Sequence, residues 1–217
     1  MRIVVTGGTG SLGRALLRRI AAAGKPMVGV LFSRDEFKQA QILESLGHPD
    51  NIRACLGDVR DPERLRMACH GADVVIHAAA LKRVDAVAQH ADETVKTNIL
   101  GSMNVFRAAI DCGVKKVLLI SSDKAVLPTN SYGASKQMAE WVATGFNTYS
   151  VPRGTRIAAI RYGNVLGSRG SVVHIWRRAI EAGHPLKLTS QDATRFVITM
   201  EQALEAIDEA LEQMQGG

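Results

Sequence analysis

The sequence is poor in cysteine and in aromatic residues. Phe, Trp and Tyr make up 5% of its 217 residues, and the three cysteines are Cys55, Cys69 and Cys112. An odd number of widely spaced cysteines in apolar contexts does not suit a disulfide framework, so we expect buried free thiols in a reducing compartment. The shortage of aromatic residues beside scattered basic ones also argues against a nucleic-acid-binding surface.

Long apolar runs and metal-binding patterns are missing too. No stretch approaches the roughly 18 apolar residues of a membrane-spanning helix. The N-terminus enters an apolar strand pattern at once, without the charged and apolar regions of a signal peptide. The six histidines show no metal-ligand spacing, and His77 lies inside an apolar run, which is typical of a core imidazole. We therefore expect a cytoplasmic protein with no membrane span and no metal.

The chain has a modest excess of positive charge. Its 27 basic and 21 acidic residues give a formal net charge of +6 at neutral pH. The basic residues are interspersed with acidic ones, as is usual for solvated helix surfaces, so we predict no nucleic-acid partner. A small positive balance suits an enzyme whose cofactor and substrate are both anionic, without proving one.

Apolar segments alternate with helical patterns along the chain. Near-continuous Val, Ile, Leu and Ala residues predict parallel strands buried on both faces. Alternation of such strands with helices predicts an α/β fold built on a Rossmann-type doubly wound parallel sheet. The predicted strands lie at about 2–6, 27–32, 51–56, 72–78, 114–121 and 155–162. The predicted helices lie at about 11–23, 35–47, 61–70, 91–112, 131–149, 171–182 and 200–214.

A glycine-rich turn, Gly7-Gly-Thr-Gly-Ser-Leu-Gly13, follows the first apolar run and opens a helix pattern. Such a turn aims backbone N–H groups and the positive end of a helix dipole at a nucleotide pyrophosphate. Gly10 would let the backbone approach the ligand, and Gly13 would let the helix pack close to the strand. A glycine-rich turn without a ligand is the alternative. The predicted cofactor-binding residues of the turn are Gly7, Thr9, Gly10, Ser11, Leu12 and Gly13.

The end of the second strand indicates which dinucleotide is bound. Ser33 and Arg34 stand where an acidic residue would favour NAD by binding the ribose 2′-hydroxyl. A hydroxyl and a forked guanidinium suit a phosphate dianion, so we predict NADP rather than NAD. Alternatively, Arg34 is a solvent-facing residue at a helix start. Further cofactor contacts are predicted at the ends of the third and fourth strands, from Asp58, Val59, Ala78, Ala79 and Ala80.

A tyrosine and a lysine four residues apart follow the fifth strand. On a helix, Tyr132 and Lys136 lie on one face and would point into the same cleft. A phenol is too weak an acid to serve as a base unless a nearby cation stabilises the phenolate, which Lys136 and an oxidised nicotinamide would do. Ser122, at the tip of the fifth strand, could bind the same substrate oxygen. A chance Tyr-x-x-x-Lys on an ordinary helix is the alternative.

These motifs resemble those of the extended short-chain dehydrogenase/reductase superfamily and, within it, the nucleotide-sugar 4,6-dehydratases of polysaccharide biosynthesis. Within that group, the chain resembles the UDP-N-acetylglucosamine 4,6-dehydratases that invert C5. The segments that carry the resemblance cover nearly the whole chain in the family's order. They are Ser33-Arg-Asp-Glu-Phe-Lys-Gln39, Gly57-Asp-Val-Arg-Asp61, His77-Ala-Ala-Ala-Leu-Lys-Arg83, Lys96-Thr-Asn98, Ser122-Asp-Lys-Ala125, Tyr132-Gly-Ala-Ser-Lys136, Arg161-Tyr-Gly-Asn-Val165, Gly167-Ser-Arg-Gly-Ser-Val172 and Thr194-Arg-Phe196.

The resemblance implies a two-part organisation and a reaction. Residues 1–165 would form the NADP-binding Rossmann domain, and residues 166–217 a small, apparently truncated substrate-binding region, since family members continue further. The reaction would convert UDP-N-acetylglucosamine to a 4-keto-6-deoxy sugar by oxidation at C4, loss of water across C5 and C6, and hydride return to C6. Asp123 would be the acid at C6 and Lys124 the base at C5. A homo-oligomer is also implied.

Four residues are predicted to contact the UDP-sugar. Lys82 resembles a family position on the substrate side, whereas Asn164, Arg169 and Arg195 would surround the nucleotide diphosphate, because a guanidinium fork matches two phosphate oxygens. Each could instead be a surface residue. Asn98 is expected to hold backbone near the fifth strand rather than to react.

Two other functions remain open from the sequence. A UDP-sugar 4-epimerase would need Tyr132 and Lys136 but not the Asp123-Lys124 pair. A catalytically impaired NADP-binding remnant or sensor is suggested by the shortened end.

Overall fold

Six parallel strands form the central sheet of the computed structural model, which describes residues 1–168, 170–186, 188, 190 and 192–216. Their order across the sheet is β3-β2-β1-β4-β5-β6. Successive strands are therefore added on one side of β1 up to β3 and on its other side from β4 on. This confirms the predicted Rossmann-type doubly wound sheet. The strands are β1 (Arg2–Thr6), β2 (Val28–Ser33), β3 (Ile52–Leu56), β4 (Val74–His77), β5 (Lys116–Ile120) and β6 (Arg156–Ile160).

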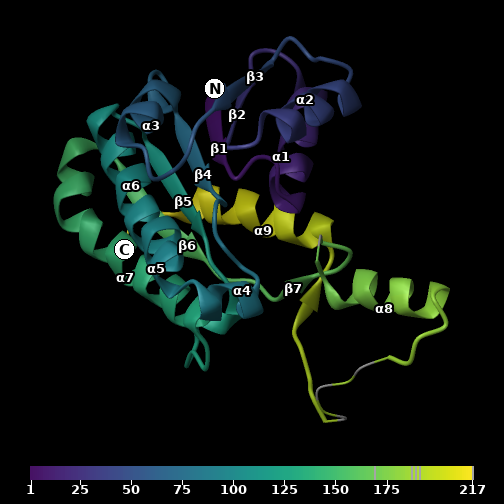
Figure 1. Cartoon of the computed structure of the whole chain (residues 1–217). Coiled ribbons are helices and arrows are strands. Elements are labelled where there is room, and N and C mark those ends of the chain that lie inside the picture. The colour runs from purple at the N-terminus through teal and green to yellow at the C-terminus, as the bar shows by residue number, and fades with distance from the viewer. Residues whose placement is uncertain (169, 187, 189, 191, 217) are drawn as a thin grey trace.

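Helices cover both faces of the sheet (Figure 1). One face carries α1 (Ser11–Ala23), α2 (Glu36–Ser45) and α9 (Met200–Gln213), and the other carries α3 (Pro62–Cys69), α6 (Gly101–Asp111) and α7 (Ser131–Ser150). Successive strand residues point to opposite faces, so each strand feeds two apolar layers. The first layer includes Leu17, Leu31 and Leu204, and the second includes Phe32, Phe106 and Phe146.

The segment between β4 and α6 departs from the single helix predicted at 91–112. It consists of α4 (Val84–Gln89), α5 (Ala91–Thr94) and a π-helical turn, η1 (Val95–Leu100), which runs directly into α6. The backbone breaks at His90, where φ is −125° and ψ is 60°. A π-helical turn inside a helix often lies beside a functional site.

The C-terminal part begins outside the main sheet and then returns to it. The short strands β7 (Asn164–Val165) and β8 (Val197–Ile198) pair in parallel, and α8 (Val172–Glu181) projects away from the sheet (Figure 1). Helix α9 then packs against α1 and buries Ala203, Leu204 and Ile207 in the same layer. The predicted domain boundary at residue 165 would therefore separate α9 from the apolar layer that it completes. That boundary stays a prediction.

Two kinds of feature are absent from the described residues. None of the helices in this part of the chain is both long and apolar enough to cross a bilayer. Over the same residues, no three His, Cys, Asp or Glu side chains gather as metal ligands would.

His77, the last residue of β4, is a fully buried imidazole. Its Nδ1 lies 2.6 Å from Thr6 Oγ1 and its Nε2 lies 3.0 Å from Ser102 Oγ, so both ring nitrogens have partners. Burial, followed by the charge of Lys136, lowers the pKa of His77 from 6.5 to about 3. The imidazole is therefore neutral in the folded protein at every pH near neutrality.

This shift makes stability depend on pH. Between pH 6.5 and about 3, the unfolded chain binds a proton at His77 that the folded protein excludes. The stabilisation is complete above pH 6.5 and is lost as the pH falls toward 3, by up to about 1.4 kcal/mol per pH unit. Urea unfolding of the wild type and of His77→Gln from neutral pH into the acid range should show the stability difference shrinking, because glutamine does not titrate. A constant difference would contradict the buried neutral imidazole.

Candidate active site

The glycine-rich turn lies between β1 and α1, against the end of β4. Gly7 has φ +66°, and a Cβ there would lie 2.7 Å from the backbone nitrogen of Ala79. The Gly10 N–H donates to the Gly7 carbonyl at 2.8 Å and closes the turn. Ala78 and Ala79, two predicted cofactor residues, therefore lie directly beside the turn.

Helix α1 starts at Ser11 with an open N-terminal end. Its N-cap is Gly10, which supplies no side-chain cap, and its first turn contains no acidic residue. A Cβ on Gly13 would lie 2.5 Å from Gly8 Cα, so the helix begins in close contact with the turn. Backbone N–H groups at the positive end of a helix, behind a glycine-rich turn, fit a pyrophosphate.

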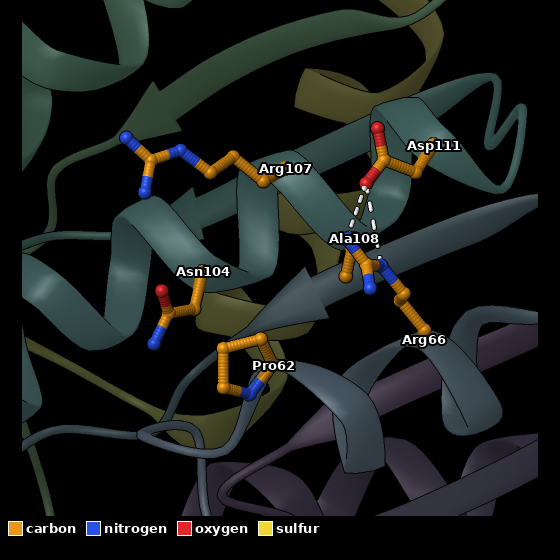
Figure 2. A pocket seen from close by; sticks show the side chains of 6 residues that line it. All are labelled: Pro62, Arg66, Asn104, Arg107, Ala108 and Asp111. Carbon is orange, nitrogen blue, oxygen red and sulfur yellow. Dashed lines mark hydrogen bonds and ion pairs between the residues drawn. The ribbon is translucent and has the colours of Figure 1, made fainter.

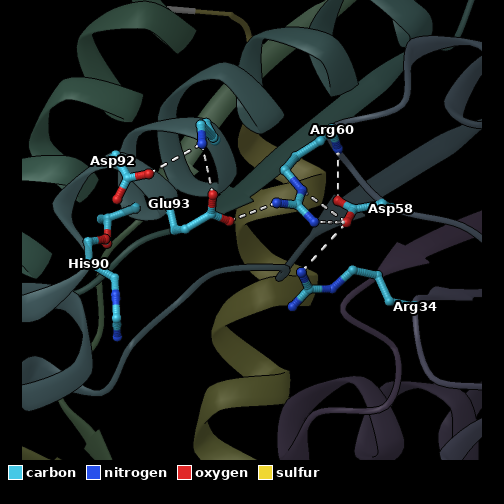
Figure 3. Close-up of polar contacts among 8 residues, drawn as sticks. Arg34, Asp58, Arg60, His90, Asp92 and Glu93 are labelled. Carbon is cyan, nitrogen blue, oxygen red and sulfur yellow. Dashed lines mark hydrogen bonds and ion pairs between the residues drawn. The ribbon is translucent and has the colours of Figure 1, made fainter.

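A chain of ion pairs crosses the ends of β2 and β3 (Figure 3). Arg34 Nη1 lies 3.5 Å from Asp58 Oδ2, and Arg60 Nε donates to the same oxygen at 2.9 Å. Arg60 Nη1 also donates to Glu93 Oε2 of α5 at 2.8 Å. Burial alone would raise the pKa of Asp58, but hydrogen bonds from Arg60 and the charge of Arg34 hold it below its usual value.

The two predicted phosphate-binding residues differ in accessibility. The side chain of Arg34 is 53% exposed, so its guanidinium can reach a ligand. Ser33 is buried, and its hydroxyl accepts a 3.0 Å hydrogen bond from Gln39 Nε2. A hydroxyl that accepts one bond keeps its own proton to donate. Val59 is buried, and its carbonyl accepts from Asn104 Nδ2.

A cavity of about 440 Å³ runs from Arg34 to the segment after β4 and to α4 and α5. It brings together three predicted site residues, Arg34, Ala80 and Lys82. Thr97 Oγ1 is buried beside it and has no hydrogen-bond partner among the described residues. A mostly apolar cavity with a cationic rim and an unpaired hydroxyl suits a nucleoside that carries an anionic group.

Asn98 of η1 holds the segment after β4. Its Oδ1 accepts from the Leu81 N–H at 2.8 Å, and its Nδ2 donates to the Leu81 carbonyl at 2.9 Å and to Ser135 Oγ at 3.0 Å. The expectation that Asn98 holds backbone is thus confirmed. It joins the end of β4 to α7.

Three predicted catalytic residues follow β5, where Ser122 caps the 3₁₀ turn η2 (Asp123–Ala125). Asp123 Oδ1 accepts from Ser122 Oγ and from Lys124 Nζ, each at 2.9 Å. Lys124 Nζ also donates to Oδ1 of Asn164 in β7, at 2.7 Å. Burial would raise the pKa of Asp123, but the bonds from Lys124 and Ser122 outweigh it and lower that pKa. The Asp123 carboxyl group therefore favours its ionised form, in contact with Lys124 Nζ.

Tyr132 and Lys136 project from the first turns of α7, whose N-cap Asn130 accepts from the Gly133 N–H. Lys136 is buried, and its Nζ donates to the Ile120 carbonyl at 2.7 Å. Burial lowers the pKa of Lys136 to about 8, against an opposing effect of Glu140. Burial also raises the pKa of the Tyr132 phenol, although a hydrogen bond with Ser122 lowers it. The expected lowering of the Tyr132 pKa by Lys136 is not found.

The structure adds one buried residue that the sequence reasoning missed. Glu140, one helical turn beyond Lys136, accepts a hydrogen bond from Ser121 Oγ and bonds at 3.0 Å from Arg161 Nε. Its spacing of four residues from Lys136 is the signal that could have indicated it, since such residues share a helix face.

The remaining predicted substrate residues are two arginines. Arg195 is exposed, and its Nη1 donates to the neighbouring Thr194 carbonyl. The carbonyl of the next residue, Phe196, accepts a hydrogen bond from the Asn164 N–H. Arg195 is therefore the sequence neighbour of a residue that pairs with Asn164. Arg169 lies outside the described residues.

A second hollow, of about 310 Å³, lies between α3 and α6 (Figure 2). Arg66 and Asp111 pair across it at 3.3 Å. None of the predicted site residues lines it, so the candidate active site is the region at the carboxyl ends of the strands.

A doubly wound sheet with a glycine turn after β1 and a Tyr-x-x-x-Lys helix after β5 defines a short-chain dehydrogenase/reductase fold. The chain belongs to the polysaccharide biosynthesis protein family, whose model matches residues 3–217.

Two of the similar proteins carry different names. The UDP-N-acetylglucosamine 4,6-dehydratase (inverting) of Campylobacter jejuni is 40% identical over 216 residues, which are 99% of this chain and 64% of that protein. A UDP-glucose 4-epimerase of Rickettsia conorii is 38% identical over 213 residues, 97% of this chain and 62% of that protein. The solved structure of Pen from Bacillus thuringiensis has a TM-score of 0.95 and 36% identity, covering 100% of this chain and 67% of that one. The chain thus spans less than two thirds of the length of the first two proteins.

The glycine contacts predict opposite effects of one substitution at two helical positions. Gly13→Ala places a Cβ against the backbone of Gly8, so we expect a loss of about 1–3 kcal/mol in the free energy of unfolding. Gly145→Ala is the matched control: a Cβ there meets nothing within 4 Å, and we expect a gain of about 0.5–1 kcal/mol. Urea denaturation measures both. Equal effects at the two sites would contradict the close packing of α1 on the turn.

Proposed function

We propose that this chain carries the cofactor-binding and catalytic residues of a nucleotide-sugar 4,6-dehydratase that acts on UDP-N-acetylglucosamine. The observation that carries the proposal is the Asp123–Lys124 pair, joined at 2.9 Å beside Ser122 and Tyr132. Oxidation and reduction at C4 alone need one proton acceptor. Loss of water needs a second acid and base, and this pair supplies them.

NADP is the proposed cofactor. Its pyrophosphate would lie on the turn from Gly7 to Gly13, its 2′-phosphate at Arg34 and Ser33, and its adenine at Asp58 and Val59. Thr9, Ser11 and Leu12 would contribute to the same turn, and Ala78, Ala79 and Ala80 would line its path. When bound, the nicotinamide would take up a hydride from C4 of the sugar and return it to C6.

The first proton would be handled by residues of α7 and η2. Tyr132 would accept the proton of the C4 hydroxyl, and the Lys136 charge would favour the phenolate. Ser122, which already hydrogen-bonds the phenol, would bind the same substrate oxygen. Tyr132 and Lys136 would also contact the cofactor.

Elimination would use the Asp123–Lys124 pair. Lys124 would remove the C5 proton while Asp123 protonates the C6 hydroxyl, which leaves as water. This requires a neutral amine and a protonated acid at the start, which a proton transfer along the 2.9 Å bond from Lys124 to Asp123 would supply, and it leaves an ammonium and a carboxylate. As hydride returns to C6, Lys124 would give a proton back to C5, and the proton that Tyr132 took from the C4 hydroxyl would reach Asp123 through Ser122, which hydrogen-bonds both groups. Asn164 holds Lys124 in place from β7.

The substrate and the setting are part of the same proposal. Lys82, Asn164, Arg169 and Arg195 would bind the UDP-sugar, with the guanidinium groups matching the diphosphate oxygens. A cytoplasmic location, a homo-oligomeric state, the absence of nucleic acid and metal, and a substrate-binding region over 166–217 stay predictions from the sequence.

A UDP-sugar 4-epimerase is the second candidate, favoured by the 38% identity to the Rickettsia protein of that name. It would use Tyr132 and Lys136 and would leave Asp123 and Lys124 without a chemical task. A catalytically impaired NADP-binding remnant or sensor is a third reading.

The mass of the product separates these candidates. Incubated with UDP-N-acetylglucosamine, the protein should release a product lighter by one water, as read by mass spectrometry and NMR. Lys124→Ala should block water loss yet accumulate reduced cofactor, seen by its absorbance, because without elimination the hydride has no acceptor at C6. Lys115→Ala, at a lysine that is 76% exposed, is the control and should behave as wild type.

Each contrary result has a defined meaning. A product of unchanged mass would favour the epimerase. No product from folded, cofactor-loaded protein with several UDP-sugars would favour the sensor. Water loss at the wild-type rate in Lys124→Ala would exclude Lys124 as the C5 base.

Cofactor preference is tested at Arg34. Wild-type protein should bind NADP more tightly than NAD, and Arg34→Asp should reverse the order, because a carboxylate repels the 2′-phosphate and accepts from the ribose hydroxyl. Arg18→Asp on the exposed side of α1 makes the same change in net charge and should leave the ratio alone. Isothermal titration measures the two affinities, and a wild-type preference for NAD would refute the assignment.

A further inference from the structure

Glu140 is a buried carboxylate at the meeting point of three elements. It projects from α7, its side chain is 9% exposed, and it accepts hydrogen bonds from Ser121 at the end of β5 and from Arg161 just after β6. Ser121 and Arg161 are direct sequence neighbours of Ser122 and of Tyr162, respectively. One side chain therefore links the helix of Tyr132 and Lys136 to both strand ends.

The backbone around this junction depends on the same elements. The Tyr162 carbonyl accepts the Asp123 N–H at 3.1 Å, and the Ile160 carbonyl accepts the Ser121 N–H at 2.8 Å. The turn that carries Asp123 and Lys124 is thus bonded to the chain segment that Arg161 ties to Glu140.

Lys136 lies on the same face of α7, one turn before Glu140. Its ammonium donates to the Ile120 carbonyl and is deeply buried. The titratable and charged groups around it include Glu140 and Tyr132 of α7, His77 of β4, Asp123 and Lys124 of η2, and Arg161 and Tyr162 after β6. His77 is neutral, so Glu140 is the nearby anion on its own helix.

We propose that Glu140 is a positioning residue for the Tyr132–Lys136 pair: its buried carboxylate, held by Ser121 and Arg161, keeps the Lys136 ammonium charged and holds α7 in register with the ends of β5 and β6. The role deepens the proposed function and rests on it, because it matters to turnover only if Tyr132 acts as the proton acceptor.

Electrostatics supports this role. Burying a carboxylate costs free energy even when it is paired, so a buried ion pair is weak evidence for stability alone. Burial pushes the Lys136 pKa down to about 8, and the charge of Glu140 is the effect that opposes it. Without that charge, the pKa of Lys136 would fall further, so a smaller fraction of Lys136 would be charged at neutral pH to favour a phenolate at Tyr132.

The test reads the charge of Lys136 directly. In protein labelled with ¹³C-lysine, NMR follows the Lys136 Cε signal against pH, with Lys136→Met to assign it. The wild-type signal should titrate near pH 8. In Glu140→Gln the midpoint should fall by about one to three pH units, the usual effect of one adjacent opposite charge. An unchanged midpoint in Glu140→Gln overturns the proposal.

Two further variants separate charge from structure. Ser121→Ala removes one bond to Glu140 but keeps its charge, so the Lys136 midpoint should stay within a few tenths of wild type. If Glu140→Gln does not fold because Arg161 is left unpaired, Glu140→Gln/Arg161→Gln is compared with Arg161→Gln. The double variant should titrate at lower pH than the single one, and equal midpoints would refute the role of Glu140.

Turnover is measured in parallel, so that the two proposals can fail separately. With UDP-N-acetylglucosamine, Glu140→Gln should lower kcat at neutral pH, leave KM little changed, and shift the pH profile in the same direction as the NMR midpoint. A shifted midpoint without any product from wild type would contradict the proposed function alone. Normal turnover with an unshifted profile in Glu140→Gln would contradict the role of Glu140 alone.

Discussion

The parallel pairing of β1 with both β2 and β4 is the constraint on which the site depends. Thr6 at the end of β1 pairs in register with Phe32 of β2 and with His77 of β4, so the three strands end at one level. The bond between Thr6 and His77 ties two of those ends together. Because parallel strands present their carboxyl ends at one edge, the segments that follow them must meet there. The close approach of Gly7 to Ala79 is a direct consequence.

Two sets of acid and base groups meet at that edge from different elements. Tyr132 and Lys136 come from a regular helix, whereas Asp123 and Lys124 come from a short turn that must be held from outside. Asn164 of β7 supplies one such contact, through its bond to Lys124. Glu140 and Arg161 join the helix to the strand end that precedes β7. Oxidation at C4 and elimination at C5 and C6 act on adjacent atoms, which explains why a dehydratase would need both sets within one site.

Local sequence patterns were enough to predict the strands of the sheet and the first residues of most helices. Near-continuous Val and Ile runs marked the buried strands, and Asp61-Pro62 marked the start of α3, where Asp61 caps the Arg64 N–H. The π-helical turn η1 was not predictable, because its Asn98 contacts Leu81 and Ser135, which are distant in the sequence.

The long-range partners of the charged residues could not be predicted from the sequence either. Arg34 meets Asp58, and Lys124 meets Asn164, because strand ends lie together in space. Residue type and spacing identified the candidate groups, but their protonation depends on burial and on these tertiary contacts. The raised pKa of Tyr132 is an example, since burial outweighs the hydrogen bond with Ser122 and no lowering by the neighbouring lysine is found.

The central claim is that this site removes and later restores a proton at C5 of a nucleotide sugar. Turnover of UDP-N-acetylglucosamine in deuterium oxide, followed by NMR and mass spectrometry at early times, tests it most directly. The account predicts a product that has lost one water and carries one solvent deuterium at C5. A product that retains the original C5 hydrogen, or whose mass equals that of the substrate, would contradict it.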